Sequence, residues 1–84
     1  MARISARELC ERLKSEAIVK QDKSMDNDLR LRTLEYFIAH DPSDDVFENA
    51  LKARINDPDP DKKQSKVICA EILGAWQSRT NASL

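Results

Sequence analysis

Apolar residues recur at helical spacing along almost the whole chain, and this spacing limits what the chain can fold into. Apolar side chains three and four positions apart line one face of an α-helix, whereas a half-buried strand needs strict alternation. Glycine, which sheet proteins use in tight turns, occurs once in 84 residues. These features predict an all-α fold, and the length allows one domain, residues 1–84.

Capping signals mark the first two helices. Ser5 and Glu8 have the spacing of a capping box, and Ile4 and Leu9 are placed to pack across it. After a polar connector at residues 20–23, Ser24 or Asp26 can cap the second helix, because short polar side chains accept hydrogen bonds from first-turn amides. Both candidates for the second cap remain open.

Two Asp-Pro pairs, Asp41-Pro42 and Asp59-Pro60, predict the starts of the last two helices. In each pair the aspartate can cap free amides, and the proline φ suits the first helical position. The chain therefore predicts a compact bundle of about four helices with a short flexible tail. The expected helices cover approximately residues 5–20, 25–40, 42–56 and 60–78, and the tail covers 80–84.

The second and fourth helices are expected to be apolar on two sides. Two explanations remain open: each helix touches two neighbours within the bundle, or the extra stripe is an interface for a partner protein or a second copy. Small residues favour the interface, because they let two helices approach closely. The candidate partner-binding residues are Met25, Leu29 and Tyr36 on the second helix, and Val67, Ala70 and Gly74 on the fourth.

Three other apolar residues are assigned to the core. Trp76 lies on the main apolar arc of the fourth helix, which favours burial over a role as an interface anchor. Cys10 and Cys69 are too few for a disulfide framework and are interpreted as small buried hydrophobes.

The residues that carry most enzyme chemistry are scarce. The chain has one histidine and two cysteines, and it contains neither a glycine-rich phosphate loop nor a glycine-flanked serine. His40 is expected at a helix C-terminus, where the dipole favours it, and the aspartates at 41, 44 and 45 are explained by capping. We therefore expect no catalytic, cofactor-binding or metal-binding site and no small-molecule substrate.

The remaining function classes are a helical protein-protein interaction module and, as the alternative, a helix-turn-helix-like DNA-binding regulator. Lys62, Lys63 and Lys66 would open the recognition helix of such a motif. However, the preceding turn is acidic and the net charge is −1, which disfavours nucleic acid. The chain has neither a membrane-length apolar run nor a signal-peptide pattern, so we expect a cytoplasmic protein that does not engage a membrane.

One part of the chain resembles a known repeat. An acidic-proline turn, Asp-Pro-Asp-Pro at 57–60, precedes a helix that contains Ala-Glu-Ile-Leu-Gly-Ala-Trp at 70–76. This pattern resembles the HEAT-repeat helical hairpin, and a shift of 35 positions aligns apolar residues of the second and fourth helices, so the likeness covers residues 26–76. The helix is about one turn longer than the family pattern at 61–65, and the chain offers no third repeat. The resemblance implies a protein-binding scaffold.

Overall fold

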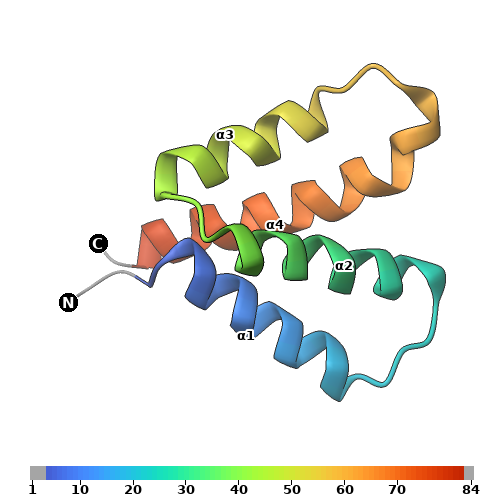
Figure 1. Cartoon of the computed structure of the whole chain (residues 1–84), viewed down its shortest axis with the longest axis horizontal. Helices are drawn as coiled ribbons and strands as arrows, with labels where there is room; N and C mark the ends of the chain where they lie inside the picture. Colours follow the sequence, from blue (N-terminus) through green and yellow to red (C-terminus); the bar gives the residue numbers. More distant parts are fainter. Residues whose placement is uncertain (1–3, 83–84) are drawn as a thin grey trace.

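The computed structural model describes residues 4–82, with side chains to residue 79, and its helices form two hairpins (Figure 1). The first hairpin consists of α1 (Ala6–Val19) and α2 (Met25–His40). The second consists of α3 (Asp44–Ile55) and α4 (Lys63–Ala82), with the short 3-10 helix η1 (Pro60–Lys62) leading into α4. The described residues contain no strand, so the predicted all-α bundle of about four helices is confirmed.

Three of the predicted helix starts are confirmed by their caps. The Ser5 side chain accepts a hydrogen bond from the Glu8 amide at 3.1 Å. The Ser24 side chain accepts from the Asn27 amide at 3.2 Å, which identifies Ser24 rather than Asp26 as the second cap. The Asp59 carboxylate accepts from the Asp61 amide at 2.9 Å and so begins η1.

The expected helix start at Asp41-Pro42 is wrong. Asp41 instead ends α2, with its amide donating to the Phe37 carbonyl oxygen at 2.9 Å and its backbone in the left-handed region. Ser43 caps α3, because its side chain accepts from the Val46 amide at 3.4 Å. A serine between the proline and the helix therefore takes the capping position that the sequence pattern assigned to the aspartate.

The expected end of the last helix near residue 78 is also wrong. After η1, α4 begins at Lys63 and continues to Ala82, which includes part of the expected tail. The rest of that tail, residues 83–84, lies outside the described residues.

The core forms where the two hairpins meet. The helices of each hairpin pack along one another, and the hairpins join chiefly through α2 and α4. Cys10, Cys69 and Trp76 belong to this core, as expected, and are at most 3% exposed. The buried cluster consists of Ala6, Leu9, Cys10, Leu34, Phe37, Phe47, Leu51, Ile68, Cys69, Ile72 and Trp76.

The N-terminal segment is tied to the last helix by Arg79. Its Nη1 donates to the Ile4 carbonyl oxygen at 2.8 Å, and its guanidinium lies over the Trp76 ring at 3.5 Å from the centroid. Among the described residues, no helix combines the length and the apolar character that crossing a membrane requires.

Candidate functional site

The apolar strip predicted on α4, which consists of Val67, Ala70 and Gly74, lies open on the surface. Val67 is 50% exposed, Ala70 is exposed, and a Cβ added to Gly74 would meet no atom within 4 Å. At 100° per residue this strip lies opposite the buried Ile72 on the helix. We call these three residues the α4 strip. α4 touches two neighbours, α2 and α3, as one explanation expected, but they leave this strip uncovered.

The candidate residues on α2 form a less uniform set. Met25, at the start of the helix, is 88% exposed. Leu29 is half-buried and packs against the core cluster. Tyr36 is 46% exposed and is turned toward α3, because the Arg54 guanidinium lies 4.8 Å from its ring centroid. Met25 and Tyr36 are therefore exposed, as the α4 strip is, and Leu29 is not.

Two further exposed apolar side chains, on α1, were not among the predicted residues. Ile18 is 55% exposed and Val19 is 79% exposed, both at the end of α1. Leu31 lines one surface hollow with Ile18 and a second hollow with Met25, so the two hollows share a lining residue, whereas Val19 lines neither. The helical spacing could have predicted their exposure, because Ile18 and Val19 lie off the apolar stripe formed by Leu9, Leu13 and Ala17.

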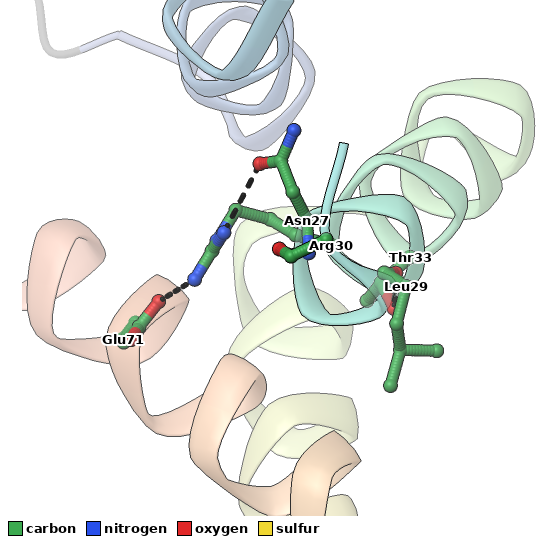
Figure 2. Close-up of polar contacts among 6 residues, drawn as sticks. Asn27, Leu29, Arg30, Thr33 and Glu71 are labelled. Carbon is green, nitrogen blue, oxygen red and sulfur yellow. Dashed lines mark hydrogen bonds and ion pairs between the residues drawn. The ribbon is translucent and has the colours of Figure 1, made fainter. Parts of the chain in front are cut away.

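A polar contact joins the hairpins beside a hollow between α1, α2 and α4 (Figure 2). Arg30 Nη2 donates to Glu71 Oε2 at 2.7 Å, and Arg30 Nη1 donates to Asn27 Oδ1 at 3.2 Å. Asn27 is 3% exposed and donates through Nδ2 to the Asp22 carbonyl oxygen at 2.8 Å. The hollow has a volume of about 450 Å³, with Leu34 and Ile72 among its lining residues. Of these contacts, the Arg30–Glu71 pair joins the two hairpins, and the Asn27 bonds lie within the first hairpin.

Cys10 and His40, which the sequence offered as reactive side chains, are buried in the core and bound at a helix end, respectively. Burial raises the pKa of the Cys10 thiol to about 12, so this thiol stays protonated at neutral pH. His40 lies in the last turn of α2, where its Nδ1 is 2.8 Å from the Tyr36 carbonyl oxygen and its ring stacks on the Tyr36 ring. Among the described residues, no group of three or more His, Cys, Asp and Glu side chains has the arrangement of a metal site.

The lysines considered for DNA binding lie where the second hairpin turns. Lys62 in η1 and Lys63 at the start of α4 are exposed, and Lys66 is half-buried. The Lys62 ammonium is 3.7 Å from the Asp57 carboxylate, so one of these charges is already paired within the turn. The acidic turn therefore pairs with the lysine of η1.

Comparison of the chain with models of known protein families, with curated proteins and with solved structures found no match. The HEAT-like resemblance stays a prediction.

Proposed function

We propose that this protein is a small helical protein-protein interaction module, an adaptor, antagonist or regulatory subunit that acts by occupying the surface of a partner. The observation that carries this proposal is the exposure of the α4 strip. Val67 leaves half of its side chain in water, and Ala70 and Gly74 leave the helix backbone accessible beside it. A partner helix can approach such a surface closely and bury it.

The side of α4 opposite the α4 strip packs into the core, so the strip itself makes no part of the core. The opposite side of α4 carries Ile68, Ile72 and Trp76, all at most 3% exposed. The position of the helix is thus fixed by core packing, and the α4 strip is held on a rigid element. A preformed helical face binds with a smaller loss of conformational entropy than a flexible segment does.

The test is capture of partners from the source cell with a photo-crosslinker placed at position 70, in the parent chain and in the Val67→Glu variant. A charge at Val67 should not unfold the chain, because this side chain is already half exposed, but it should block apolar docking on the strip. We expect the captured proteins to be lost in the variant while the helical circular dichroism is unchanged.

Val46→Glu is the matched control. Val46 is an equally apolar side chain, 58% exposed, on α3. If the same proteins are captured by all three chains, or if both variants lose them equally, the α4 strip is not the binding surface and the proposal is wrong.

A further inference from the structure

The connector between the two hairpins is short and is held in an unfavourable backbone conformation. α2 ends at His40 and α3 begins at Asp44, so residues 41–43 alone join the hairpins. Asp41 has φ 43° and ψ 56°, in the left-handed region that only glycine enters without steric cost. Asp41 also precedes Pro42, and a proline biases the residue before it toward extended backbone. In the folded chain Asp41 therefore has a backbone conformation that neither its own side chain nor the following proline favours.

The surface along which the hairpins meet is mostly apolar and deeply buried. Leu34 and Phe37 come from the first hairpin and are at most 2% exposed; Phe47, Ile72 and Trp76 come from the second and are at most 3% exposed. We call these five residues the inter-hairpin face. A hairpin separated from its neighbour would expose these side chains to water, so it needs another hairpin of the same shape to cover them.

Polar contacts across this face also pair one hairpin with the other. Arg30 of α2 binds Glu71 of α4 at 2.7 Å. The Arg54 guanidinium of α3 lies 4.9 Å from the Phe37 ring centroid. Each contact needs one partner from each hairpin and would form equally well if the two hairpins belonged to different chains.

We propose that the chain exchanges hairpins with a second copy of itself. In the exchanged dimer the connector straightens, Asp41 leaves the left-handed region, and the first hairpin of each chain packs on the second hairpin of its partner. Short hinges under strain favour this kind of exchange, because opening relieves the strain while all other contacts re-form. The exchange does not use the α4 strip, so the dimer would present two strips and bind a repeated partner with higher avidity.

The first test is the solution mass by light scattering after refolding at roughly 10 µM and roughly 500 µM, because exchange is governed by mass action. We expect a dimer whose share grows with the refolding concentration. Asp41→Gly should weaken the dimer about tenfold or more, because glycine removes the steric cost of the closed connector. Arg7→Gln is the control: it removes the 3.9 Å ion pair between Arg7 and Asp41 but keeps Asp41 itself, so we expect it to leave the dimer unchanged.

The second test distinguishes an exchanged dimer from two bundles lying side by side. Arg30→Glu and Glu71→Arg each place like charges across the inter-hairpin face, where the parent chain has the Arg30–Glu71 pair. When the two variants are refolded together, an exchanged heterodimer restores opposite charges at both junctions. Native mass spectrometry should then show more heterodimer than random pairing of the two variants would give.

Three results would overturn hairpin exchange: a monomer at both concentrations, a dimer that Asp41→Gly does not weaken, or a purely statistical mixture of the charge variants. The inference is independent of the proposed function. Val67→Glu should leave the exchanged dimer intact, so failure of partner binding and failure of exchange can be told apart.

Discussion

Phe37 of α2 and Phe47 of α3 meet edge to face, with ring centroids 4.9 Å apart and ring planes at 82°. Phe47 makes a second edge contact with Trp76 of α4 at 5.0 Å. Phe47 is therefore the residue through which three helices share one aromatic cluster. Edge contacts of this kind add to the free energy gained by burial.

Replacement of Phe47 should cause a large loss of stability. Phe47→Ala removes a fully buried ring and both edge contacts, so we expect the free energy of unfolding to fall by about 3–5 kcal/mol. Urea unfolding followed by circular dichroism measures the change. The neighbouring Val46 is 58% exposed, and Val46→Ala should change stability by no more than about 0.5 kcal/mol. Equal effects of the two substitutions would contradict this description of the core.

Asn27 should contribute to stability through hydrogen bonds that no apolar residue can replace. Its Nδ2 donates to the Asp22 carbonyl oxygen at 2.8 Å, and its Oδ1 accepts from Arg30. Asn27→Ala removes these two partly buried hydrogen bonds, which should lower the free energy of unfolding by about 1–2 kcal/mol. Asn49 is exposed on α3, and Asn49→Ala is the matched control in the same urea experiment. A cost at position 49 as large as that at position 27 would refute this role for Asn27.

The cap of α3 can be tested by comparing two serines. Ser43→Ala removes the side chain that accepts from the Val46 amide and should lower the free energy of unfolding by about 1 kcal/mol. Ser15 is exposed within α1, where alanine is a better helix former, so Ser15→Ala should be neutral or slightly stabilising. A neutral Ser43→Ala would show that the Ser43 cap does not stabilise α3. Thermal unfolding resolves both changes.

Alkaline pH should destabilise the fold through Cys10. Burial raises the pKa of this thiol from 9.0 to about 12, so between these values the unfolded chain loses the thiol proton while the folded chain keeps it. The contribution of the protonated Cys10 thiol to the free energy of unfolding is therefore complete below pH 9. Above pH 9 the free energy of unfolding falls by up to about 1.4 kcal/mol per pH unit, and the fall levels off near pH 12. Urea unfolding from pH 8 to 11 should show a shallower decline in Cys10→Ala than in the parent chain. Parallel declines in the two chains would show that the thiol does not carry this dependence.

Local interactions made much of the fold predictable. The Ser5, Ser24 and Asp59 caps each depend on a side chain and an amide within three residues, so short patterns contain the information. The α4 strip could be found in the same way, because helical spacing alone separates it from the buried arc of Ile68, Ile72 and Trp76. The error at Asp41 has the same origin: the Asp-Pro pair matched a helix-start pattern, whereas the cap was formed two residues later by Ser43.

The sequence by itself determined that the chain forms helices, where most of them begin, and which side of each helix is apolar, because these properties arise from neighbouring residues. Only the tertiary structure decided which apolar stripes are covered. It placed Leu34 inside the inter-hairpin face and left Val67 and Met25 in water, although all three are apolar residues on predicted helices. Burial depends on how two hairpins meet, and contacts between residues as distant as Arg30 and Glu71 contribute to that arrangement.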